Sequence, residues 1–162
     1  FLISPMPTKF RFIDIFHQFI YNYNRKVVKT MKINYDCLRE LLIVLEENLQ
    51  FSDNLEYPDL TFTEITKLMS DYSNADIAYS TIMAQEAELI KAHIIDAGNC
   101  FNECIYFSLT YKGHKFLENV KNNKIWTQTK NIVGKVGSIS LDIISTIASK
   151  VLQDLITKQL QF

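Results

Sequence analysis

The chain has 162 residues, of which 48% are hydrophobic and 22% are charged, and its net charge is −1. This length suits one domain with an appendage, and the composition excludes the low hydrophobicity and high charge of a disordered protein. A net charge near zero also excludes a whole-molecule field that would draw the chain to a polyanion such as nucleic acid.

The charges are unevenly distributed along the chain. Residues 1–30 carry five basic residues and one acidic residue, whereas residues 31–60 carry two basic and seven acidic residues. Residues 61–100 are acidic again, with two basic and six acidic residues. Residues 101–162 are basic, with eight basic and four acidic residues. A phosphate backbone would therefore find its cations mainly in the C-terminal part of the chain.

Residues 1–30 differ from the rest of the chain. They begin with Phe1 rather than methionine, hold many aromatic residues in a short span and end in a basic run. Met31-Lys32-Ile33-Asn34 then resembles an ordinary bacterial protein start, preceded by residues that a purine-rich, ribosome-binding sequence could encode. We therefore predict that residues 1–30 are an N-terminal extension translated from a misread leader. The alternative is a basic, aromatic, amphipathic arm that lies on a membrane surface.

The first predicted helix begins at Asn34 and ends near Leu49. Asn34 is a good N-cap, and leucines recur after it at three- and four-residue steps, with acidic residues elsewhere on the helical wheel. These two signals predict an amphipathic helix with one buried face.

A loop, a short strand and a brief helix are predicted next. Turn-forming residues fill the stretch 50–60, which we expect to be a loop. Leu60-Thr61-Phe62 is predicted as a short strand. The helix after it is capped either by Thr61 together with Glu64 or by Thr63 alone.

A third helix is predicted from a capping box at Ser73-Asn74-Ala75-Asp76, where the hydroxyl and the carboxylate satisfy the first turn. We expect this helix to run through Ile77 towards Leu89-Ile90. Many winged-helix sequences end this helix with Glu-Ala-Gly-Leu-Ile, in which glycine takes the left-handed turn at little cost. Here Glu88 stands in place of that glycine, so either Glu88 accepts strain or the helix ends differently.

A β-hairpin and another helix follow the third helix. Two apolar runs, residues 93–95 and 104–107, flank the turn signal Gly98-Asn99, and residues 110–117 return to a helical pattern. The order helix, strand, turn, strand, helix is typical of the end of a winged helix, a scaffold used mainly for recognition.

The last predicted helix is about 20 residues long and is capped by Ser138 or Ser140. Gly134 and Gly137 interrupt the chain before it. One side of the helix is apolar and must be buried against its own domain, a second copy of the chain or another surface. We predict that four of these apolar residues form a homodimer seam: Ile144, Ile147, Val151 and Leu155.

The fold class predicted from these elements is mainly α with a small β-hairpin, that is, α+β. A winged helix-turn-helix domain is expected over residues 31–120, followed by a C-terminal helical extension over residues 121–162. No apolar run approaches the roughly 18 residues needed to cross a bilayer, so we expect no membrane span.

Several stretches of the chain resemble a family of uncharacterised proteins that is common in phages and prophages of Gram-positive bacteria. The residues that carry this resemblance are Met31 to Arg39, Leu109 to Leu117, Lys124 to Trp126 and Val136 to Leu141. The resemblance implies a winged-helix-like N-terminal part and a phage or mobile-element context. It implies no biochemical activity and no catalytic residues.

The candidate binding residues lie on the third helix and in the basic C-terminal part. From the third helix we expect the outward-pointing side chains to be Asn74, Tyr79, Ser80 and Gln85. Asparagine and glutamine can recognise adenine edges, but no Lys or Arg lies between Lys67 and Lys91 to neutralise phosphates. The lysines that could contact phosphates instead are Lys112, Lys115, Lys121 and Lys124, together with Lys130 and Lys135. The alternative is that these lysines form a solvated face.

The sequence gives no sign of an enzyme. It lacks a phosphate-binding glycine loop and the strings HExxH and GxSxG, and His114 is expected to make a local hydrogen bond. Cys100 and Cys104 are separated by three residues rather than the usual two of a zinc knuckle, so we predict no metal and no cofactor. The chain has three cysteines, Cys37, Cys100 and Cys104, which are too few for a disulfide framework. We therefore expect buried, reduced thiols in a bacterial cytoplasm.

Two functions therefore remain open. The first is a small DNA-binding regulator that binds double-stranded DNA, is dimeric through the last helix and uses the basic C-terminal part for phosphate contacts. The second is a winged helix that binds a protein, in which the acidic third helix contacts a basic host or phage protein.

Overall fold

The structure is a computed structural model that describes residues 32–98, 100–136 and 139–160. The predicted N-terminal extension, residues 1–30, lies outside the described residues. The first described helix, α2 (Tyr35–Asn48), begins after Asn34, whose side-chain oxygen accepts a hydrogen bond from the Cys37 N–H at 3.2 Å. The leucines that predicted this helix are almost completely buried: Leu38, Leu41, Leu42 and Leu45. The prediction of an amphipathic first helix is confirmed.

A two-residue strand and a short helix follow a loop, as expected. Strand β1 (Leu60–Thr61) is one residue shorter than predicted, because helix α3 (Phe62–Leu68) already begins at Phe62. Thr61 caps this helix in a reciprocal pair with Glu64. The Thr61 N–H donates to the Glu64 carboxylate at 2.8 Å, and the Glu64 N–H donates to the Thr61 hydroxyl at 3.3 Å. The first of the two proposed caps is therefore the one that forms.

Helix α4 (Asn74–Glu86) is capped by Ser73, which accepts from the Asp76 N–H at 3.1 Å. The helix ends earlier than predicted, because the chain turns at Glu88, whose φ is +59°. This is the strained, left-handed backbone expected from a glutamate in the place of glycine. Helix α4 packs mainly on α2.

Replacing Glu88 with glycine should raise the free energy of unfolding by about 0.5–1 kcal/mol, because glycine adopts this backbone conformation without a Cβ penalty. Chemical denaturation would measure the gain. Glu88→Ala is the matched control, since it also removes the carboxylate near Lys112 but keeps a Cβ at positive φ. Equal stability of the glycine and alanine variants would contradict the expectation.

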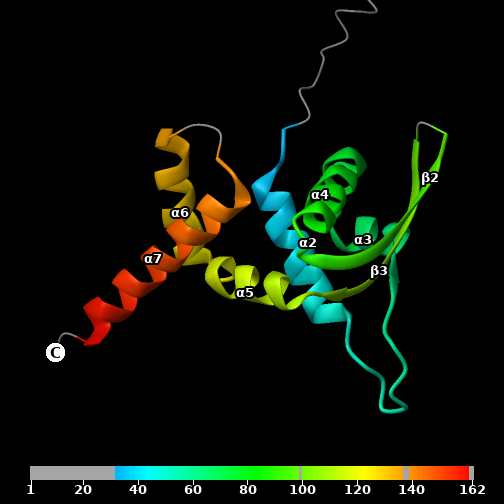
Figure 1. The fold of residues 1–162 in the computed structure, drawn as a ribbon, viewed down its shortest axis with the longest axis horizontal. Helices are drawn as coiled ribbons and strands as arrows, with labels where there is room; N and C mark the ends of the chain where they lie inside the picture. The colour runs from blue at the N-terminus through cyan, green and yellow to red at the C-terminus, as the bar shows by residue number, and fades with distance from the viewer. Residues whose placement is uncertain (1–31, 99, 137–138, 161–162) are drawn as a thin grey trace, which may run out of the picture. The chain divides into compact units, whose positions relative to one another are not determined.

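A three-stranded antiparallel sheet follows, with the order β1-β3-β2. Strands β2 (Ile90–Ala97) and β3 (Cys100–Leu109) form the predicted hairpin, and both extend well beyond the predicted runs. Ile90 pairs with Leu109 at the base. Gly98 takes a positive φ of 65° at the turn. Figure 1 shows β2 and β3 as a long curved ribbon that ends in this turn.

Helix α5 (Tyr111–Val120) is tied to the end of α4 through Thr110. The Thr110 hydroxyl accepts from the Gly113 N–H at 2.9 Å and donates to the Glu88 carbonyl at 2.6 Å, while the Thr110 N–H donates to the Leu89 carbonyl at 2.9 Å. Gly113 lies directly against Leu89, where no Cβ would fit. The run of residues 109–117 is therefore a packing junction.

Helix α6 (Asn123–Val136) lies within the predicted C-terminal helical extension, but the sequence did not predict it as a separate helix. Its buried face contains Ile125, Trp126 and Thr129. Thr129 is fully buried, and its hydroxyl donates to the Ile125 carbonyl within the helix at 2.8 Å. A polar residue at a core-facing position breaks the apolar periodicity on which the sequence analysis relied.

The last helix, α7 (Leu141–Leu160), has 20 residues and matches the predicted length. It contacts α5 and α6. Of its predicted seam residues, Ile144 and Val151 are buried within the chain, and Ile147 and Leu155 are half-buried. Much of the apolar stripe is thus covered by the chain's own helices.

A polar cluster joins α2 to the start of α6. The Arg39 side chain is buried, and its Nε donates to the Val120 carbonyl at 2.7 Å. Its Nη2 donates to the Lys121 carbonyl and, at 2.7 Å, to the Asn123 side chain. One guanidinium therefore satisfies three acceptors around the junction of α5 and α6.

Asp36 on α2 completes this cluster. Its carboxylate accepts from the Trp126 indole at 2.6 Å and from the Lys130 ammonium at 2.8 Å. Partial burial acts to raise the pKa of Asp36, but these two hydrogen bonds outweigh it and leave the pKa below its ordinary value. The carboxylate therefore stabilises the fold at neutral pH, and this contribution is lost as the pH falls through the lowered pKa.

The described residues thus form an α+β structure with six helices and a small three-stranded sheet. Among the described helices, none combines the length and the apolar character that crossing a membrane requires. The domain boundary at residue 120 remains a sequence prediction, although helices on both sides of it meet at Arg39.

Candidate functional site

The outer face of α4 was the first candidate surface, and the structure places its four predicted residues differently. Asn74 is exposed and Tyr79 is half-buried. Ser80 is completely buried beside the Cys37 thiol, because its position on α4 faces α2, so it does not point outward as expected. Gln85 turns towards the hairpin, where its amide donates to the Ala92 carbonyl at 3.2 Å.

The C-terminal half of α4 presents an apolar strip and an acidic residue to solvent. Ile82 and Met83 are half-buried, like Tyr79, and Glu86 near the end of the helix is exposed. The sequence places no cation on this helix. Ile82 and Met83 are not among the candidate residues of the sequence analysis, although their three- and four-residue spacing from Tyr79 indicates a shared face.

The predicted lysines do not converge on one surface. Lys121 forms an ion pair with Glu46 of α2, and Lys130 is bound to Asp36. These two cations are engaged by carboxylates of the same chain, which the sequence could not show. Lys124 is exposed on α6.

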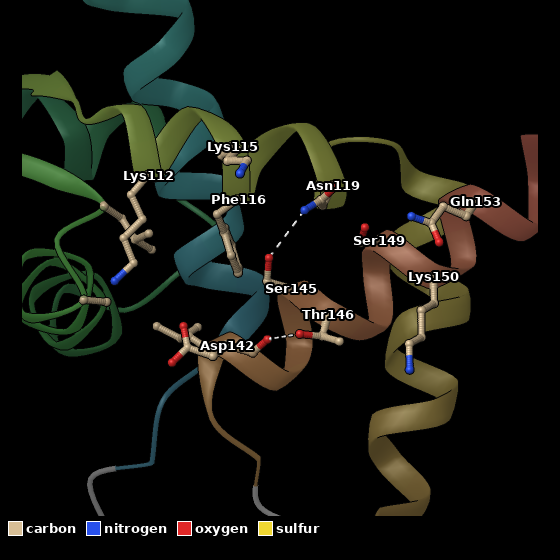
Figure 2. Close-up of a pocket in the computed structure, with 13 residues that line it drawn as sticks. Lys112, Lys115, Phe116, Asn119, Asp142, Ser145, Thr146, Ser149, Lys150 and Gln153 are labelled. Carbon is tan, nitrogen blue, oxygen red and sulfur yellow. Dashed lines mark hydrogen bonds between the residues drawn. The ribbon is translucent and has the colours of Figure 1, made fainter.

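Lys112 and Lys115 do meet, in a groove between α5 and α7. The groove has a volume of about 540 Å³ and also reaches the end of α4 at Ala87 and Leu89. Figure 2 shows Lys112 at one end, Lys150 of α7 at the other, and Phe116 between them. Lys150 was missed from the sequence because no pattern indicates that it faces α5.

The groove is suited to holding anionic groups. Three lysines and one acidic residue, Asp142, line it, together with neutral polar residues. The neutral residues are Asn119, Ser145, Thr146, Ser149 and Gln153. The Asn119 amide donates to the Ser145 hydroxyl at 3.4 Å, so the two walls are linked. Lysine ammonium groups and hydroxyls favour phosphate or carboxylate ligands.

Lys112 is partly engaged, since its ammonium lies 3.8 Å from the Glu88 carboxylate. In the part of the chain that the structure describes, Lys115 and Lys150 form no such ion pair. The positive charge available to a ligand therefore comes chiefly from the middle and the α7 end of the groove.

The cysteines are not arranged as a metal site. Cys37 and Cys104 are buried, as expected, but Cys100 is exposed in the hairpin, because it directly follows the turn. Burial raises the pKa of both buried thiols, that of Cys104 to about 11. Within the described ranges, no three His, Cys, Asp or Glu side chains are grouped to hold a metal ion.

Thiol labelling should therefore distinguish the three cysteines. At pH 8 in native conditions, we expect rapid reaction of one thiol per chain, at Cys100, because Cys37 and Cys104 are inaccessible and poorly ionised. Absorbance of released thionitrobenzoate would count the reacted thiols, and Cys100→Ser should abolish the rapid phase. Rapid release of three equivalents from folded protein would contradict this expectation.

Comparison with known proteins identifies a family and a distant relative. The family model described as "Hypothetical protein (DUF2513)" matches residues 32–140, which includes α2 to α6 and stops before α7. A protein of Haemophilus influenzae, described as "Uncharacterized protein", is 29% identical over 129 residues, covering 78% of this chain and 99% of that protein. No solved structure matches the chain significantly.

Proposed function

This chain belongs to the DUF2513 family, and from that premise we propose that it is a non-enzymatic winged-helix protein that acts by binding another protein. The element order supports the winged-helix part of this proposal. Helices α2, α3 and α4 precede a hairpin whose second strand pairs with β1, and in a winged helix with this order α4 would be the recognition helix.

The surface of α4 is the observation that carries the proposal. Tyr79, Ile82 and Met83 lie half-buried on this helix, and exposed Glu86 follows them. Aromatic residues and methionine are enriched in protein interfaces, whereas DNA phosphates would be repelled by a helix with acidic residues and no cation. Over residues 32–160 the chain carries 12 basic and 17 acidic residues, which opposes DNA binding further.

DNA binding is the second candidate function, and the groove between α5 and α7 favours it. Lys112, Lys115 and Lys150 could contact successive phosphates beside the end of α4. Such a regulator would be dimeric through α7, using the residues that remain exposed there, Ile143, Ile156 and Leu160. Either function would operate in a bacterial cytoplasm in a phage or mobile-element context.

A DNA titration would separate the two functions. For the protein-binding function, we expect no saturable change in the anisotropy of a labelled 30-base-pair duplex at 50 mM salt. A DNA-binding regulator with three phosphate contacts would bind, and its affinity would fall roughly 40-fold between 50 and 200 mM salt. The triple variant Lys112→Ala, Lys115→Ala, Lys150→Ala would then lose binding.

The matched control removes the same charge elsewhere, through Lys32→Ala, Lys67→Ala and Lys158→Ala, all at exposed positions. Nuclease-treated affinity purification gives the complementary measurement. We expect a protein partner that remains bound to the full chain and is lost on Met83→Ser. Saturable DNA binding that only the groove variant abolishes would overturn the proposed function.

A further inference from the structure

The loop between α2 and β1 exposes large apolar side chains at its surface. Phe51 is 61% exposed, Leu55 80% and Tyr57 85%. The Phe51 and Tyr57 rings lie 5.2 Å apart, centre to centre, so they form one aromatic pair. In Figure 1 this loop reaches away from the helices, below α2. Concentrated exposed apolar surface of this kind marks interaction sites.

A groove lies behind the loop. It has a volume of about 410 Å³, and its apolar lining comes from the loop, the end of α2 and strand β3: Leu45, Leu49, Phe51, Tyr57, Pro58, Phe107 and Leu109. Phe107 is itself 41% exposed. The aromatic pair and the groove therefore form one continuous apolar surface, with space for side chains of a partner.

Leu55 is held at the end of the loop against its own backbone preference. Its φ is +63°, a conformation that strains leucine and suits glycine. Two hydrogen bonds fix the turn, from the Leu55 N–H to the Ser52 carbonyl at 2.9 Å and from the Glu56 N–H to the Ser52 hydroxyl at 3.1 Å. Because Leu55 is 80% exposed, its side chain buries little apolar surface within the fold and is accessible to a partner.

The charge around the apolar surface is negative on the loop side. Five acidic residues and no basic residue occur from Glu46 to Asp59. Glu46 is already paired with Lys121, which leaves four exposed carboxylates. The opposite wall carries Lys91 and His114. A partner segment would therefore place its cations along the loop.

We propose that this surface, residues 50–59 with Phe107 and the groove between them, binds a basic segment of a partner protein that carries apolar anchor side chains. The anchors fill the groove and pack on the aromatic pair, while lysines or arginines of the segment pair with the loop carboxylates. This inference rests on the proposed function only in that the occupant is a protein, because it uses a surface other than α4.

Peptide binding by the full chain tests the inference. The probes are three fluorescein-labelled 14-residue peptides: alternating Lys and Leu, alternating Glu and Leu, and alternating Lys and Ser. We expect saturable binding of the Lys-Leu peptide, with roughly tenfold or more loss of affinity for each of the others and for Tyr57→Ala protein. Equal binding of the Glu-Leu peptide, or unchanged binding by Tyr57→Ala, would overturn the inference.

Leu55→Gly distinguishes a binding role from a structural one. Glycine relieves the strain at φ +63°, so we expect a thermal midpoint at or above that of the wild type together with weaker binding of the Lys-Leu peptide. A lower midpoint with unchanged peptide affinity would show that Leu55 serves the fold, and would count against the inference.

Two further measurements separate this inference from the proposed function and from self-association. Met83→Ser on α4 should leave the affinity for the Lys-Leu peptide unchanged. If Met83→Ser abolished peptide binding and Tyr57→Ala did not, the inference would be overturned while the role of α4 would stand. Sedimentation should show no self-association that depends on Tyr57. Self-association of the wild type that Tyr57→Ala abolishes would show that a second copy of the chain occupies the surface, and would overturn the inference. Saturable DNA binding would contradict only the proposed function.

Discussion

Gly113→Ala is expected to lower the free energy of unfolding by about 3 kcal/mol or more. A Cβ at position 113 would lie 2.0 Å from the Leu89 carbonyl oxygen and 2.9 Å from its carbonyl carbon. Both are backbone atoms of the turn between α4 and β2, and the Leu89 carbonyl also accepts the Thr110 N–H, so the turn cannot yield cheaply. Urea denaturation followed by circular dichroism would measure the loss.

Gly134→Ala is the matched control for this substitution. Gly134 lies in α6, is exposed, and has no atom within 4 Å of the position of an added Cβ. Alanine is the better helix former, so this variant should gain about 0.5 kcal/mol. The same chemical change should therefore have opposite effects at the two sites. A Gly113→Ala protein as stable as the wild type would show that α5 does not approach the turn so closely.

Arg39→Met is expected to cost about 3 kcal/mol, because it leaves the Val120 and Lys121 carbonyls and the Asn123 side-chain oxygen without their buried donor. Methionine keeps the aliphatic length, so the loss reports on hydrogen bonds rather than on a cavity. Arg39→Lys should recover little of it, since one ammonium cannot reproduce the planar fork. Thermal and chemical denaturation would both record the change.

Lys67→Met is a suitable control for the lost charge, because Lys67 is exposed on α3. Its effect on stability should lie within about 0.5 kcal/mol of zero. Comparable losses for Arg39→Met and Lys67→Met would contradict the assigned role of Arg39.

Local hydrogen-bonding signals made much of the fold predictable. The caps at Asn34, Thr61 and Ser73 are confirmed, because a side chain that satisfies the first helical turn acts within three residues. The strain at Glu88 was predictable for the same reason, since the conformation of one residue decides it. The hairpin was located correctly, although its strands are longer than the apolar runs.

Features that depend on contacts between distant segments were not predictable. Helix α6 was predicted only as part of a helical extension and not as a separate element, because Thr129 occupies a buried position where the pattern required an apolar residue. Ser80 was expected at the surface, yet the packing of α4 on α2 buries it. In each case the environment of the side chain is set by another element, which periodicity within one segment cannot reveal.

The candidate site was predictable only in part for the same physical reason. Lys112 and Lys115 do line one groove, but Lys121 and Lys130 are paired with carboxylates about 75 and 94 residues earlier in the chain. The third lysine of the groove, Lys150, is contributed by α7. Which cations are available to a ligand is therefore decided by tertiary ion pairs rather than by the local charge count.

The contacts of Arg39 also constrain how the polypeptide is made and how it can be shortened. Helix α2 leaves the ribosome early, yet the acceptors of its guanidinium lie at residues 120–123, so this closure must wait until most of the chain has been synthesised. A fragment that stops at residue 120 would lack Asn123, which accepts from Arg39, and the Trp126 indole, which donates a hydrogen bond to Asp36. Expression trials of the N-terminal part should therefore retain the segment through Val136.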